Sequence, residues 1–179
     1  MASGGSRLWF VFACAAAVVA VAAPASLAAP SASRFSVAGL ESGLLQQLNA
    51  IRADHGLSAL RSNAKLAAAA DQHSREMADD GYFNHDSVDG TSFSSRIARW
   101  YPLGTFHSWL VGENLLWSSP TVDPSGAVAM WMRSPPHRAN ILNRNFRDIG
   151  IGAVYSTSAR GAYTHVPVTI VTTDFGVRR

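Results

Sequence analysis

The chain has 179 residues, with 15 lysines and arginines against 12 acidic residues and a formal net charge of +3. All but one of these cations are arginines, scattered without forming a run, so we expect no nucleic-acid partner. The single cysteine, Cys14, lies in an apolar stretch near the N-terminus, which excludes a disulfide framework or a thiolate metal site from the rest of the chain.

The first 28 residues have the pattern of a secretory signal peptide. Arg7 is their only charge, an apolar run covers residues 8–23, and small residues follow it. We expect cleavage after Ala28, because a cut one residue later would place Pro30 first. The alternative is a retained membrane anchor, but the apolar run is shorter than the roughly 20 residues that a spanning helix needs. We therefore expect a secreted, extracellular monomer of 151 residues with no transmembrane segment.

Residues 29–41 are predicted to be a short lead-in, and residues 42–179 a single domain. Helical spacing of apolar residues predicts a first helix from Leu40 to Gly56 and a second from about Asn63 to Gly81. The second helix carries His73 on its apolar face, where we expect a hydrogen-bonded core histidine more than a ligand. A third, shorter helix is predicted over residues 91–100.

The second half mixes helix and strand. Residues 109–117 form an apolar run with Glu113 as its only charge, and this carboxylate must be exposed, paired or in a polar cleft. A helix is predicted from Asp123-Pro124 to the break at Pro135-Pro136, and two strands over 149–155 and 166–175. Helices that precede strands, without repeats, favour an α+β fold with a small antiparallel sheet.

Three polar residues are candidates for catalysis or binding. His137 directly follows the tandem proline, which turns the chain sharply and presents this side chain at a corner. His85 lies in the polar loop after the second helix, and Glu113 is the carboxylate of the apolar run. The residues alone do not show that the three meet, because 52 positions separate the histidines. Zincin, nucleophile-elbow, phosphate-loop and dinucleotide-binding motifs are all missing from the sequence.

Five motifs in order resemble the CAP superfamily, which comprises cysteine-rich secretory proteins, antigen five and plant pathogenesis-related proteins. They are Asn49-x-x-Arg52 with Gly56-Leu57, Tyr82-Phe83-Asn84-His85, Gly112-Glu113-Asn114-Leu115, Trp131-x-x-Ser134 with Pro136-His137-Arg138-x-Asn140-Ile141-Leu142, and Ile149-Gly150-Ile151-Gly152. The chain is similar to the bacterial, cysteine-free branch. The resemblance implies an α-β-α sandwich with a cleft of two histidines and two glutamates, here His85, His137 and Glu113. The second glutamate is replaced by Ser134.

The resemblance leaves three functions open. The first is an extracellular binding module for a small apolar ligand, a cell-envelope component or an extracellular protein. The second is a weak zinc-dependent hydrolase or peptidase, with His85 and His137 as zinc ligands and Glu113 as a third ligand or as the base. The third is a purely structural His/Glu network. If the cleft holds a cofactor, we expect zinc and no other.

Overall fold

Five α-helices, one short 3-10 helix and four strands form within residues 35–179, the part of the chain that the computed structural model describes. In chain order they are α1 (Val37–Asp54), β1 (Arg61–Ser62), α2 (Ala64–Asp80), α3 (Phe93–Trp100), β2 (Trp109–Ser118), α4 (Pro124–Arg133), α5 (Pro135–Ile141), β3 (Asp148–Ala159), η1 (Gly161–Tyr163) and β4 (Val166–Arg178). The predicted signal peptide over residues 1–28 lies outside the described residues.

The four strands form one sheet in the order β1-β3-β4-β2. β4 is central and pairs antiparallel with both β2 and β3, and Glu113 on β2 lies opposite Asp174 on β4. This confirms the predicted α+β class with its antiparallel pairs. The two-residue strand β1, which pairs in parallel with β3, was not predicted because two residues are too few to show an alternating pattern.

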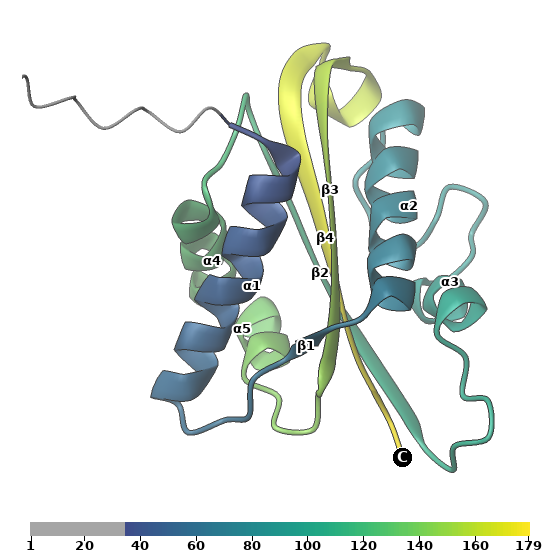
Figure 1. Ribbon diagram of the computed structural model, residues 1–179. Coiled ribbons are helices and arrows are strands. Elements are labelled where there is room, and N and C mark those ends of the chain that lie inside the picture. Colours follow the sequence, from purple (N-terminus) through teal and green to yellow (C-terminus); the bar gives the residue numbers. More distant parts are fainter. Residues whose placement is uncertain (1–34) are drawn as a thin grey trace, which may run out of the picture. The chain divides into compact units, whose positions relative to one another are not determined.

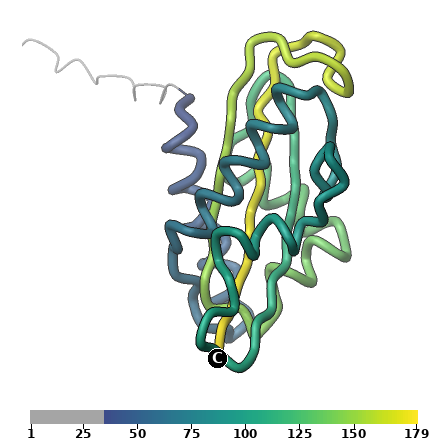
Figure 2. The backbone as a smooth tube through the Cα atoms, turned by 90° about the vertical axis from the view of Figure 1, so that its right-hand side faces the viewer, coloured from purple at the N-terminus to yellow at the C-terminus, as the bar shows by residue number. Residues whose placement is uncertain are grey.

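Helices cover both faces of the sheet, which gives the three-layer arrangement of an α-β-α sandwich (Figure 1). α1, α4 and α5 lie on one face, where Leu44, Leu48 and Trp131 join the main apolar core. α2 and α3 lie on the other face, where Leu66 and Ile97 belong to a smaller cluster. Figure 2 shows α2 running along the sheet and the β3–β4 hairpin extending at the end opposite the C-terminus.

Two glycines of β3 allow α2 to pack directly on the sheet. A Cβ atom on Gly150 would lie 2.0 Å from the backbone carbonyl carbon of Leu66, and one on Gly152 would lie 2.1 Å from the backbone nitrogen of Asp71. Both distances are far below van der Waals contact, so no larger residue fits without moving the helix. The Gly-x-Gly pattern is therefore a packing requirement of this fold.

Two helix boundaries differ from the sequence prediction. α1 begins at Val37, inside the predicted lead-in, because the side chain of Ser36 caps it by accepting from the backbone N–H of Gly39. The tandem proline does end α4, but a new helix, α5, begins at Pro135 itself. Proline is well tolerated in the first turn of a helix, so the same residues stop one helix and start the next. His137 therefore lies in the first turn of a short helix.

The helices found within residues 35–179 are too short or too polar to cross a membrane.

Candidate functional site

The three polar residues singled out in the sequence line one cavity of about 460 Å³. His85 comes from the loop between α2 and α3, Glu113 from the edge strand β2, and His137 from the first turn of α5. Phe93 and Asn140 are also among the lining residues. The convergence that the sequence alone could not establish thus arises because β2 runs between this loop and α5.

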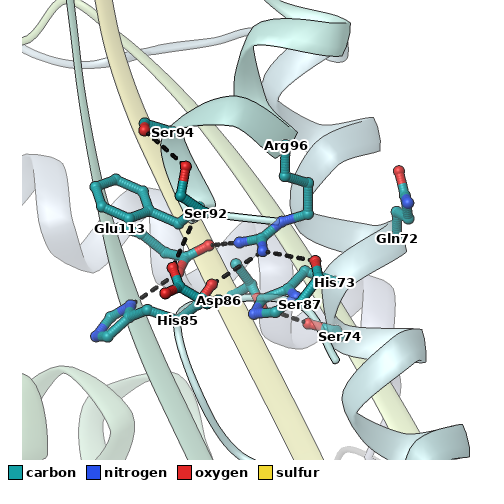
Figure 3. A network of polar contacts seen from close by, with 12 residues as sticks. Gln72, His73, Ser74, His85, Asp86, Ser87, Ser92, Ser94, Arg96 and Glu113 are labelled. Atoms are coloured by element: carbon teal, nitrogen blue, oxygen red, sulfur yellow. Dashed lines mark hydrogen bonds and ion pairs between the residues drawn. The ribbon is translucent and has the colours of Figure 1, made fainter. Parts of the chain in front are cut away.

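Glu113 is buried and engaged on both of its carboxylate oxygens. Its side chain is 1% exposed, and its Oε1 lies 2.8 Å from Nδ1 of His85. Because a carboxylate only accepts, the imidazole donates from Nδ1, and its Nε2 is left on the side away from Glu113 (Figure 3). The other oxygen, Oε2, accepts from Nη2 of Arg96. The sequence left open whether this carboxylate is exposed, paired or in a polar cleft, and the structure shows it paired with His85 and Arg96.

Arg96, on α3, links the Glu113 carboxylate on β2 to the loop that carries His85. Its Nη1 donates to the backbone oxygen of His85 over 2.9 Å and to the hydroxyl of Ser87 over 3.2 Å, while Nη2 binds Glu113 (Figure 3). The guanidinium is buried, so it holds both the carboxylate and the His85 loop in place. Arg96 was not among the residues predicted from the sequence. It lies between Phe93 and Ile97 on the apolar stripe of α3, and a lone arginine in such a stripe is a detectable signal.

A second carboxyl group, Asp174, is buried beside Glu113 on the neighbouring strand. Neither of its oxygens has a hydrogen-bond partner among the described residues. Burial and the negative charge of Glu113 raise the pKa of Asp174 well above its usual range, although Arg96 acts in the opposite direction. One buried arginine can balance only one carboxylate, and Arg96 pairs directly with Glu113, so ionisation of Asp174 is the one that is disfavoured.

The core histidine predicted on α2 is present as expected. His73 is fully buried, and its Nε2 donates to the backbone oxygen of Asn84 over 2.9 Å. Burial lowers the pKa of His73 and outweighs the opposite effect of Glu113. This neutral imidazole fixes the start of the loop that carries His85, and it is not among the residues that line the cavity.

His137 is held by contacts between α5 and the edge of β2. Its backbone oxygen accepts from the Asn114 side chain over 3.1 Å, and the Asn140 side chain donates to the backbone oxygen of Glu113 over 3.0 Å. Burial, and then the charge of His85, lower the pKa of His137. The imidazole is thus neutral at pH 7 and can either donate or accept a hydrogen bond.

Two other motif residues support the site from a distance. The side chain of Asn49 exchanges two hydrogen bonds with the backbone of Leu60, over 3.0 and 2.7 Å. The buried Arg52 donates to the backbone oxygens of Ile141 and Asn143 at the end of α5. Arg52 thus fixes the end of α5, which carries His137, whereas Asn49 ties α1 to the segment before β1; neither residue lines the cavity.

A second, mainly apolar pocket of about 260 Å³ adjoins the polar cavity and shares His137 with it. Its lining residues come from β2, the His85 loop, α4, α5 and the residue between these two helices: Phe83, Leu115, Leu116, Trp117, Met130, Trp131, Ser134 and His137. Ser134, the position at which the resemblance implies a second glutamate, therefore lines the apolar pocket and not the polar cavity. The side chain of Ser134 thus contributes a small hydroxyl, and no carboxylate, to the wall of the apolar pocket.

The donors around the polar cavity are two imidazoles and one carboxylate that is already bound within the protein. Within residues 35–179 no three histidine, cysteine or acidic side chains are arranged to hold a metal ion. The two imidazoles of His85 and His137 could contribute nitrogen ligands, but the Glu113 carboxylate already binds Arg96 and His85. Zinc binding by His85, His137 and Glu113 stays a prediction, and we derive no chemical step through a metal.

Sequence comparison places the chain in a known family. The model of "CAP: Cysteine-rich secretory protein family" matches residues 45–175. "Uncharacterized protein YkwD" of Bacillus subtilis (strain 168) is 35% identical over 123 residues, which cover 69% of this chain and 46% of that protein. "Uncharacterized membrane protein YlbC" of the same strain is 32% identical over 112 residues, which cover 63% of this chain and 31% of that protein. The chain thus spans less than half the length of these two relatives.

Solved structures agree with this assignment. An extracellular protein containing an SCP domain from Bacillus anthracis str. Ames is 30% identical with a TM-score of 0.58, covering 80% of this chain and 43% of that one. An outer surface protein from Borrelia burgdorferi, at 19% identity and a TM-score of 0.65, covers 81% of this chain and 97% of its own and shows the fold alone. The family model covers well over half of the chain, so this protein belongs to the CAP (cysteine-rich secretory protein) family.

Proposed function

We propose that this CAP domain is an extracellular binding module. Its ligand places a polar group in the cavity lined by His85, Glu113 and His137, and an apolar arm in the adjoining pocket beside Met130. The observation that carries the proposal is the state of Glu113, whose two oxygens are bound by His85 and Arg96 inside the protein. A carboxylate held in this way maintains the wall of a binding site and is poorly placed to take up a proton during a reaction.

The chemistry of the two spaces indicates the class of ligand. His137 is neutral at pH 7 and partly accessible, and His85, whose side chain is 49% exposed, has one nitrogen left to bond. The neutral imidazole of His137 next to an apolar pocket suits a small amphipathic molecule with an uncharged hydroxyl or amide head. A ligand with a buried charge at its head is disfavoured, because Arg96, the buried cation behind Glu113, is already paired with that carboxylate.

Action outside the cytoplasmic membrane is supported by the signal-peptide pattern of residues 1–28 and by the extracellular Bacillus anthracis relative. N-terminal sequencing of exported protein tests this part. We expect a mature chain that begins at or near Ala29. An exported chain that retains Met1 would contradict the cleavage prediction.

The binding test uses n-octyl-β-D-glucoside below its micelle concentration, because it joins a neutral hydroxyl-rich head to an alkyl chain. Calorimetry and tryptophan fluorescence should show saturable one-to-one binding. His137→Ala removes the polar contact, and Met130→Asp places a charge in the apolar pocket, so each should weaken binding about fivefold or more. His107→Ala, an exposed loop histidine outside both spaces, is the matched control and should leave binding unchanged.

Three results would refute this proposal. They are the absence of saturable binding by the unmodified protein, equal weakening in the control, and robust peptide or ester hydrolysis that depends on His85 and His137. The last result would instead support the alternative of a hydrolase, which rests on two imidazoles that line one cavity.

A further inference from the structure

A third cavity, of about 420 Å³, lies at the end of the sheet near the C-terminus and shares no lining residue with the two spaces described above. Its walls come from β1, the start of β3, the end of β4 and the segment after α3. They comprise Arg61, Ser62, Asn63, Tyr101, Phe106, Asp148 and Arg178. Two arginines and one aspartate give this lining a formal charge of +1.

Arg178 is oriented in this cavity by two aromatic rings and one backbone oxygen, and within residues 35–179 it has no acidic partner. Its guanidinium carbon lies 3.9 Å from the ring centroid of Tyr101 and 4.8 Å from that of Phe106. Nη1 donates to the backbone oxygen of Pro102 over 3.0 Å, while Nε is buried and has no hydrogen-bond partner in the described part of the chain. Across residues 35–179, no carboxylate comes within salt-bridge distance of this arginine. Two aromatic faces therefore orient a cation whose charge is not neutralised.

Asp148 also lines the cavity, but it does not act as the acidic partner of Arg178, because both of its carboxylate oxygens accept hydrogen bonds from other groups. Oδ1 accepts from Nη2 of Arg61 over 3.1 Å, and Oδ2 accepts from the Tyr101 hydroxyl over 2.8 Å. Its side chain is 15% exposed, whereas that of Arg61 is 77% exposed and keeps its remaining N–H groups in solvent. Asn63 caps α2 with its side-chain oxygen, so the positive end of the α2 dipole lies at the same cavity.

We propose that this cavity binds a singly charged oxyanion, either a phosphodiester or a carboxylate, carried by a molecule that also covers the exposed ring of Phe106. The single negative charge matches the lining charge of +1, and the planar guanidinium of Arg178 suits two oxygens of one such group. Arg61, across the cavity, supplies the second cation. This site is independent of the proposed amphipathic site at His137 and could exist without it.

The test follows the Nε–H resonance of Arg178 by nitrogen–proton NMR, because this buried N–H has no partner among residues 35–179 and reports on an added one. Two probes distinguish the two kinds of oxyanion that the cavity could bind: glycerophosphoglycerol is a phosphodiester, and N-acetylalanine is a carboxylate. We expect at least one of them to shift the resonance saturably. Arg61→Gln should weaken this binding about tenfold or more, because it removes a cation and frees Asp148 to repel the anion.

Arg138→Gln is the matched control, since Arg138 is exposed and lines none of the three spaces, and it should leave binding unchanged. Arg178→Met keeps the apolar contact with Tyr101 and Phe106 but removes the reporting N–H, so its binding is measured by calorimetry, which should show none. Arg61 is exposed, so its variant keeps the test valid if the Arg178 variant fails to fold. The proposal is overturned if neither probe shifts the Arg178 resonance, or if the control loses as much affinity as Arg61→Gln.

Discussion

Replacing Glu113 by glutamine in the Asp174→Asn background should be among the most destabilising conservative changes in this protein. The substitution removes the only acidic partner of Arg96 within the described residues, and both side chains of the pair are 1% exposed. Removing one member of a buried ion pair typically costs about 3–5 kcal/mol, because the other charge stays buried without compensation. For a domain of this size such a loss lowers Tm by on the order of 10 °C.

The Asp174→Asn background is needed because Asp174 can take the place of Glu113 as the partner of Arg96. With Glu113 neutralised, Asp174 can release its proton and become the counterion of Arg96, so the full loss should appear only in the Asp174→Asn background. The assay is urea unfolding at pH 7 by tryptophan fluorescence and circular dichroism. Adding Arg96→Met to Glu113→Gln should recover much of the loss, because no buried charge then remains.

The exposed pair between Asp71 and Arg75 provides the control for this experiment. Its side chains are 41% and 61% exposed, and Asp71→Asn should cost no more than about 0.5 kcal/mol. A loss below about 1 kcal/mol for Glu113→Gln in the Asp174→Asn background would refute the reasoning, since a broken buried pair should cost several times more. Glu113 would then not be the buried counterion on which the proposed function rests.

Three further predictions concern pH, packing and metal. The pKa of Asp174 is raised in the folded state, so its contribution to stability is complete below the unfolded value of 3.8 and is lost as the pH rises through the folded pKa. Asp174→Asn should therefore gain unfolding free energy relative to the unmodified protein as the pH rises above about 4, and a parallel pair of pH curves would contradict this. Gly150→Ala should cost at least about 3 kcal/mol, because the new Cβ atom meets the α2 backbone. Gly90→Ala, which meets no atom within 4 Å and has a φ of 81°, should cost only about 1–2 kcal/mol, and equal losses in urea unfolding would refute the packing argument. Calorimetry with zinc at about pH 7.5 should show weak binding at most, lost in His85→Ala, whereas tight one-to-one binding would show that Glu113 leaves Arg96 to become a ligand.

Much of the fold could be predicted because its elements obey regular spacing. Apolar positions in the first two helices repeat with the helical period, and Asn63 and Gly81 mark the ends of the second helix. Helix α5 could not be predicted in the same way, because a tandem proline is first of all a stop signal. Ser134 followed by two prolines is equally a helix start, and seven residues give little periodicity to detect.

The site could be predicted only in part, because its supporting charges are not marked by motifs of their own. Arg96 could have been found as an arginine in an apolar stripe. Asp174 lies near the end of a mainly apolar strand, and its meaning depends on its register with Glu113. Strand register between segments so far apart follows from tertiary packing and cannot be read from local spacing.

The central claim is that His137 and the apolar pocket beside it bind an uncharged amphipathic molecule. Intermolecular nuclear Overhauser effects with n-octyl-β-D-glucoside test it most directly. We predict contacts from the alkyl chain to the Met130 methyl group and from the sugar to the ring protons of His137, since both residues line the same pocket. A probe at saturating concentration that shows no contact with either residue would contradict the account.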